Sequence, residues 1–212
     1  MEFEDLLYLV GDIPLFTSTI LQAGDVNRAN IQKQLSRWTT ADKINQLRRG
    51  LYTLAEPYRQ KEPHPFLIAN HLISPSYVSM QSALAYYDLI PESVPQVLSV
   101  TSKFRSKLIE TPLGTYRFHH VNQHFFTGFQ LVQVIGEQSV FLARPEKALL
   151  DLIYLTKQGY SRAFLETLRL QNLDQLDLDW MQETVDYLGS SKLFKAVDNL
   201  QDMTAAINLR RL

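Results

Sequence analysis

Three histidines lie close together in the chain and suggest a metal site. His119, His120 and His124 are the residues concerned. If the segment is a strand, alternation turns His119 and His120 to opposite faces. No Cys, Asp or Glu lies nearby to complete a zinc site. We therefore expect these histidines at the surface or the edge of a core, and we predict no metal.

Two carboxylates and a Gly-Ser pair near the C-terminal end suggest nucleotidyl transfer. In such enzymes the Gly-Ser comes first, and carboxylates alternating on a strand then hold two metal ions. Here Asp177 and Asp179 precede Gly189 and Ser190, and Asp179 fits a helix N-cap. The chain also lacks a nucleophile elbow, a phosphate loop, an HExxH motif and any cysteine. We predict no catalytic residue, no enzyme activity and no cofactor.

The segment PEKALLD, residues 145–151, places three charged residues in an otherwise apolar stretch. Pro145 suits the first turn of a helix, where its missing N–H costs little. Lys147 and Asp151 are four residues apart and can pair on that helix, whereas Glu146 and Asp151 are five apart. These residues suggest either a polar site or a capped core helix. The second interpretation is favoured.

Basic charge is concentrated in one stretch. Residues 25–50 carry six Lys and Arg and two Asp, a net charge of +4, whereas residues 1–24 carry four acidic residues and no basic one. The whole chain has a net charge of −1, which argues against a general polyanion binder. A local basic stripe is the electrostatic footprint of nucleic-acid binding, although it also occurs on ordinary solvated surfaces.

The pattern of residues 26–54 predicts a helix followed by a β-hairpin. Ile31, Leu35 and Trp38 form one apolar stripe, and we expect Trp38 in the core against Phe16 and Leu51. A basic helix beside a basic hairpin tip is typical of a winged helix-turn-helix. The polar residues expected to contact DNA are Asn27, Arg28, Asn30, Lys33, Gln34, Arg37, Arg48 and Arg49. Of these, Arg48 and Arg49 should bind phosphates from the hairpin tip.

These elements predict an α+β chain: an N-terminal winged helix-turn-helix followed by a mixed α/β C-terminal domain that ends in helices. Helices at 3–9 and 16–22 would complete the DNA-binding domain, residues 1–58. The proline-rich stretch up to Pro65 predicts a linker at 59–65 with few contacts across it, so each half should fold alone. The C-terminal domain, 66–212, should begin with helices at 66–73 and 80–87, the latter capped by Ser79. Its expected strands are 97–100, 108–109, 116–118, 129–135 and 140–143, and its later helices are 145–156, 162–170, 180–188 and 191–200.

Four stretches give the sequence a family resemblance. They are LSRW (35–38), LRRGLY (47–52), SYVSMQSAL (76–84) and RPEKALLD (144–151). In this order and spacing the chain resembles the AbiEi-type antitoxins, transcriptional regulators of bacterial abortive-infection toxin–antitoxin pairs. The likeness extends to about Leu155, and no motif matches beyond it. Residues 39–43 replace a shorter link to the hairpin, so this part departs from the family pattern.

The resemblance implies two roles and two partners. The N-terminal domain would bind operator DNA and repress its own operon, and the C-terminal domain would counteract a nucleotidyltransferase toxin, with or without direct contact. The segment after Gln171 carries seven acidic and four basic residues, a net charge of −3, so DNA should not bind there. The alternative is a stand-alone winged-helix regulator whose C-terminal domain dimerises or senses a ligand.

The sequence also bears on location and assembly. The N-terminus is acidic, unlike a signal peptide, and no apolar run approaches the ~20 residues needed to span a bilayer. We therefore expect a cytoplasmic protein with no membrane partner, and a homodimer is a further expectation.

Overall fold

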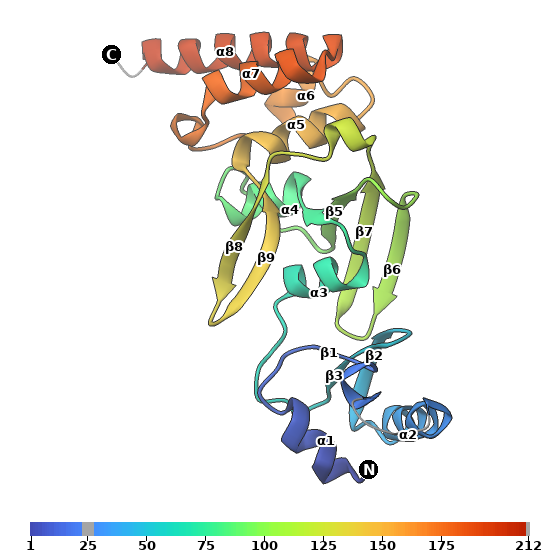
Figure 1. The fold of residues 1–212 in the computed structure, drawn as a ribbon. Helices are drawn as coiled ribbons and strands as arrows, with labels where there is room; N and C mark the ends of the chain where they lie inside the picture. The colour runs from blue at the N-terminus through green and yellow to red at the C-terminus, as the bar shows by residue number, and fades with distance from the viewer. Residues whose placement is uncertain (23–27, 211–212) are drawn as a thin grey trace.

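A computed structural model describes residues 1–22 and 28–210 of the chain. The fold is mixed α+β, as predicted, with two separate β-sheets in the part described. The smaller sheet and two helices lie at one end of the molecule, and the C-terminal helices lie at the other (Figure 1). No helix among the described residues is long and apolar enough to cross a membrane.

The N-terminal part combines short helices with a three-stranded antiparallel sheet. Its elements are α1 (Phe3–Val10), β1 (Phe16–Thr17), the 3-10 helix η1 (Ile20–Gln22), α2 (Arg28–Thr40), β2 (Ile44–Arg48) and β3 (Leu51–Leu54), with strand order β1-β3-β2. The predicted helix at 16–22 is wrong at Phe16 and Thr17, which form a strand, and only its end, Ile20–Gln22, is helical, as a 3-10 turn. Phe16 and Thr17 pair with Tyr52 and Leu51 of β3, because stacking of Phe16 on Tyr52 buries both rings.

The predicted apolar stripe of α2 is confirmed. Ile31, Leu35 and Trp38 are all buried in a cluster with α1 and the small sheet. Trp38 packs edge-on against Phe3 of α1, with ring centroids 5.7 Å apart. The expected contact of Trp38 with Leu51 is wrong, because Leu51 belongs to the other hydrophobic cluster of the molecule.

The larger part of the chain is built around a six-stranded mixed sheet of order β6-β7-β5-β4-β9-β8. Its strands are β4 (Tyr77–Val78), β5 (Val97–Thr101), β6 (Lys107–Thr111), β7 (Gly114–His120), β8 (Phe129–Ile135) and β9 (Gln138–Ala143). Five of these strands were predicted. The sequence did not reveal β4, although it pairs with both β5 and β9 at the centre of the sheet.

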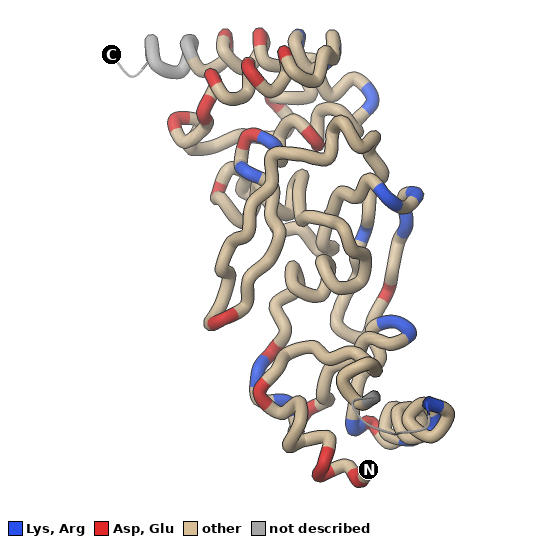
Figure 2. The backbone as a smooth tube through the Cα atoms, in the orientation of Figure 1, with Lys and Arg blue, Asp and Glu red and all other residues tan. Residues whose placement is uncertain are grey.

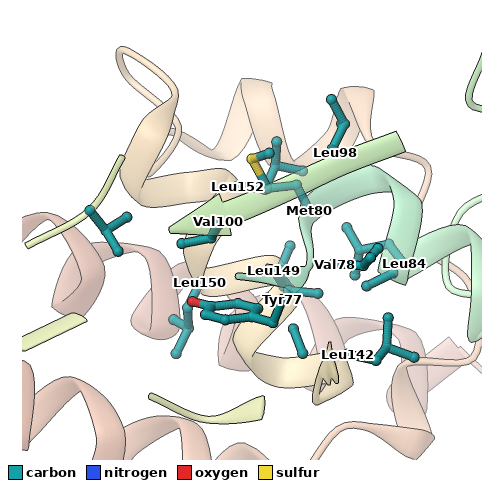
Figure 3. Packing of buried hydrophobic residues seen from close by; sticks show 14 of the residues in the cluster. Tyr77, Val78, Met80, Leu84, Leu98, Val100, Leu142, Leu149, Leu150 and Leu152 are labelled. Carbon is teal, nitrogen blue, oxygen red and sulfur yellow. The ribbon is translucent and has the colours of Figure 1, made fainter. Parts of the chain in front are cut away.

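The remaining elements of the larger part are helices. They are α3 (Pro65–Leu72), α4 (Met80–Tyr86), the 3-10 helix η2 (Gln123–Phe125), α5 (Pro145–Leu155), α6 (Arg162–Thr167), the 3-10 helix η3 (Leu173–Gln175), α7 (Leu178–Leu188) and α8 (Ser191–Arg210). Helix α5 is buried along most of its length. Figure 3 shows its Leu149 and Leu150 beside Tyr77 of β4 in the main core.

The N-terminal part and the larger part contact each other directly, in addition to being joined by the linker. Leu47 and Leu51 of the β2–β3 hairpin are buried in the cluster of the larger part. The side chain of Gln138 also fastens the linker: its Oε1 accepts the His64 N–H at 2.8 Å, and its Nε2 donates to the Glu62 carbonyl at 2.7 Å. The proline-rich stretch therefore does not isolate the two parts, contrary to the expectation of few contacts.

Candidate functional site

The outer face of α2 presents the basic and amide residues predicted to contact DNA. Arg28, Asn30, Lys33 and Arg37 are all exposed. Lys33 and Arg37 lie one helical turn apart on the side away from the buried stripe. Figure 2 shows basic residues on α2 and at the tip of the β2–β3 hairpin.

Gln34, another predicted residue of this helix, is placed differently. Gln34 is half-buried, and its Nε2 donates to the backbone carbonyl of Met1 at 2.6 Å. This bond ties α2 to the N-terminus and uses one N–H of the amide within the protein. Asn27 lies outside the described residues.

The hairpin tip holds the two predicted phosphate ligands in different environments. Gly50 turns the chain with a φ of +83°, a conformation that favours glycine. Arg49 beside it is exposed. Arg48 is exposed as well, but it contacts the larger part, where its Nε and Nη2 donate to the carbonyl of His71 at 3.2 and 3.1 Å. Sequence reasoning did not separate these two neighbours.

The histidines and carboxylates considered for metal chemistry do not converge. Nε2 of His124 lies 3.2 Å from the Tyr187 carbonyl, and burial is the main cause of the lowered pKa of His119. The residues described contain no group of three His, Cys, Asp or Glu placed to hold a metal ion. Asp177, rather than Asp179, caps α7, because its Oδ1 accepts the Trp180 N–H at 2.9 Å.

Lys147 and Asp151 of α5 form a buried ionic cluster with Tyr77 of β4 and with Ser79, which precedes α4; these four residues are the buried ionic cluster. The Lys147 ammonium donates to Asp151 Oδ1 and, at 2.8 Å, to the Tyr77 hydroxyl. Asp151 Oδ2 accepts from the Tyr77 hydroxyl at 2.9 Å and from Ser79 Oγ at 2.7 Å. Lys147 and Asp151 are only 1% and 2% exposed. The predicted pairing of Lys147 with Asp151 is confirmed.

This cluster corrects the expected role of Ser79. The residue stands at the start of α4, but its side chain makes no capping bond and serves Asp151 instead. Burial is the main cause of the strongly raised pKa of the Tyr77 hydroxyl, and the Asp151 carboxylate adds to it. Tyr77 therefore stays protonated and donates to Asp151. Every member is buried and hydrogen-bonded, so the cluster is suited to holding β4 against α5 rather than to reacting with a substrate.

The first residues of the RPEKALLD segment make a second polar connection. Glu146 is 2% exposed, and its Oε1 accepts the Asp177 N–H at 2.9 Å, just before α7. Its Oε2 accepts from Arg144 Nε at 3.3 Å, while the Arg144 guanidinium lies 4.6 Å from the centre of the Trp180 ring. The segment thus joins the sheet to the C-terminal helices.

Comparison with known proteins finds no family model that matches the chain and no similar sequence among curated proteins. The family resemblance rests on the four sequence stretches alone. Two of them, residues 76–84 and 144–151, meet in the buried ionic cluster.

Proposed function

We propose that the N-terminal part is a winged helix-turn-helix that binds operator DNA and represses its own operon. The observation that carries this proposal is the exposed basic face of α2, followed directly by a hairpin with Arg49 at its tip. An α-helix fits the major groove, and residues near the start of a recognition helix reach base edges there. Arg28 and Asn30 occupy that position, and Asn can bind adenine with two hydrogen bonds. Lys33, Arg37 and Arg49 would bind phosphates.

Replacing Lys33 and Arg37 together by Ala tests this interface in the full chain. Fluorescence anisotropy would follow binding to a duplex carrying the upstream region of the protein's own gene, across a salt titration. Each lost phosphate contact should reduce the slope of log K against log salt by about 0.9. Both side chains are exposed, so the thermal stability of the variant should stay unchanged.

The matched control is the pair Lys157→Ala and Lys195→Ala. Both lysines are exposed and belong to the C-terminal helical region, so this variant loses the same charge far along the chain from α2. Its salt slope should equal that of the unmodified protein. An equal loss of affinity in both double variants would mean that net charge, rather than the face of α2, determines binding.

We further propose that the C-terminal part counteracts a nucleotidyltransferase toxin and is not itself an enzyme. The family resemblance supports this role. The acidic surface of the C-terminal helices agrees with a partner other than DNA: Asp179, Glu183 and Asp186 of α7 and Asp198 and Asp202 of α8 are all exposed. Under these two proposals, DNA binding and protection from the toxin are separable functions of one chain.

Growth during toxin expression tests that separation. The Lys33→Ala, Arg37→Ala variant should still protect cells from the cognate toxin, although it no longer represses. The comparison requires equal amounts of both proteins, confirmed by immunoblot. Loss of protection in this variant would mean that antitoxicity works through DNA binding.

A stand-alone regulator that senses a ligand is the second candidate. A cavity between the β2–β3 hairpin and the larger part of the chain favours it. The gene neighbourhood separates the two candidates, since an adjacent nucleotidyltransferase gene supports the antitoxin role and its absence supports the regulator.

A further inference from the structure

A cavity of about 500 Å³ lies where the hairpin meets the larger part of the chain. Arg48 comes from the hairpin, Asn70 and His71 come from α3, and Phe126, Phe129 and Phe141 form an aromatic side. The volume falls within the range of about 300–1,000 Å³ that small-molecule sites occupy. Apolar walls with a few polar groups are also typical of such sites.

Arg48 brings a positive charge to this cavity. Three of its N–H groups donate to carbonyl oxygens of His71 and Arg49. Among the described residues it forms no ion pair with a carboxylate. A guanidinium carries five N–H donors, so two remain for a ligand. A carboxylate matches a guanidinium in charge and shape, because its two oxygens can accept two parallel N–H bonds.

The aromatic side of the cavity is held in place by the main core. The Phe129 ring stacks on Tyr77, with centroids 4.6 Å apart and an angle of 14° between the rings. The Tyr77 hydroxyl is itself held by hydrogen bonds with Asp151 and Lys147. Phe141 meets Phe129 edge-on at 5.9 Å and remains 46% exposed. A planar ring placed there would cover this apolar surface and gain stacking contacts.

We propose that this cavity binds a small aromatic carboxylic acid, with the carboxylate on Arg48 and the ring against Phe129 and Phe141. The ligand would touch both the hairpin and the larger part, and would therefore hold the hairpin in the position seen here. Its effect on DNA affinity rests on the proposed function, whereas the binding site itself does not.

Isothermal titration calorimetry on the full chain tests the site. The probes are benzoate and indole-3-acetate, with benzamide and indole-3-acetamide as their uncharged counterparts and acetate as an anion without a ring. Each acid should bind saturably, and at least fivefold more tightly than its amide and than acetate. Absence of saturable binding for both acids, or equal affinity for acetate, overturns the proposal.

Two pairs of variants locate the bound acid. Arg48→Gln should weaken binding at least tenfold, while Arg49→Gln removes the same charge one residue away and should change it less than twofold. Phe141→Ala should weaken binding about fivefold, while Phe104→Ala, at a residue of similar exposure outside the cavity, should not. If Arg48→Gln disturbs folding, the comparison of Phe141→Ala with Phe104→Ala decides whether the acid binds in this cavity. Equal effects within the phenylalanine pair overturn the site.

The regulatory consequence has its own readout. Anisotropy with operator DNA is repeated with the acid at saturation, and the DNA affinity should change at least threefold in the unmodified protein but not in Arg48→Gln. A constant DNA affinity at saturation overturns this consequence. Failure to bind DNA at all would refute the proposed function, and the calorimetry would still decide the site.

Discussion

We predict that removing one charge of the buried ionic cluster lowers the free energy of unfolding. Replacing Lys147 by Met removes the ammonium but keeps most of the side-chain volume. The Asp151 carboxylate then stays buried with only the hydroxyls of Tyr77 and Ser79 as donors. Breaking a buried ion pair on one side typically costs about 3–5 kcal/mol, a large part of the ~5–15 kcal/mol that keeps a domain folded.

Urea denaturation followed by circular dichroism measures this loss. With an m-value of about 2 kcal/mol/M, the midpoint should fall by roughly 1.5–2.5 M. The matched control is Arg162→Met, which removes one partner of the Arg162–Glu166 pair. That pair has the same spacing of four residues and an N–O distance of 2.9 Å, but both side chains are more than half exposed. Its loss should cost less than about 1 kcal/mol.

A fully apolar replacement of the cluster separates two quantities: the free-energy cost of leaving a buried charge unpaired, and the net contribution of the cluster to stability. The variant combines Lys147→Met and Asp151→Leu with Tyr77→Phe and Ser79→Ala, so that no buried hydroxyl is left without a partner. Its stability should equal or exceed that of the unmodified protein, because such replacements are often neutral or stabilising by about 1–4 kcal/mol. A Lys147→Met variant that loses no more than Arg162→Met would refute the reasoning.

Two further predictions concern Trp38 and His64. Trp38→Ala should cost about 3–5 kcal/mol in urea denaturation, because its ring is buried against Phe3; a variant of full stability that had lost only DNA affinity would contradict this role. His64 caps α3 by accepting the Phe66 N–H at Nδ1, and burial lowers its pKa below the ordinary 6.5. Its neutral form therefore favours the folded state, and this stability is present above about pH 6.5 and is lost as pH falls toward the lowered pKa. His64→Asn keeps a capping oxygen and should reduce the fall in unfolding midpoint between pH 7.5 and pH 5; an undiminished fall would show that other groups cause it.

The elements predicted best are those with a long, regular pattern. Residues 129–135 were predicted as a strand with the bounds that the structure has, and Pro145 marked the start of α5. Strands β1 and β4 have two residues each, too few for alternation to be visible. They exist because distant segments pair with them: β3 for β1, and β5 and β9 for β4.

The candidate sites also depend on contacts between residues that are far apart in the sequence. The spacing of Lys147 and Asp151 predicts their pairing on a helix, but nothing local in the sequence points to Tyr77 and Ser79, which lie 74 and 72 residues before Asp151. Likewise, Arg48 and Arg49 are alike in sequence. Their different contacts follow from the His71 carbonyl, which only the tertiary arrangement brings to Arg48.

The central position of β4 also has a consequence for folding during synthesis. Val78 pairs with Leu142, which follows it by 64 residues. At about 5–20 residues per second, a ribosome makes the second strand roughly 3–13 s after the first. Throughout that interval β9 is not yet available, so β4 lacks one of its two neighbouring strands. The nascent chain therefore exposes one edge of its central strand until the last strand of the sheet emerges, and a chaperone that shields such edges would act on this chain in that period.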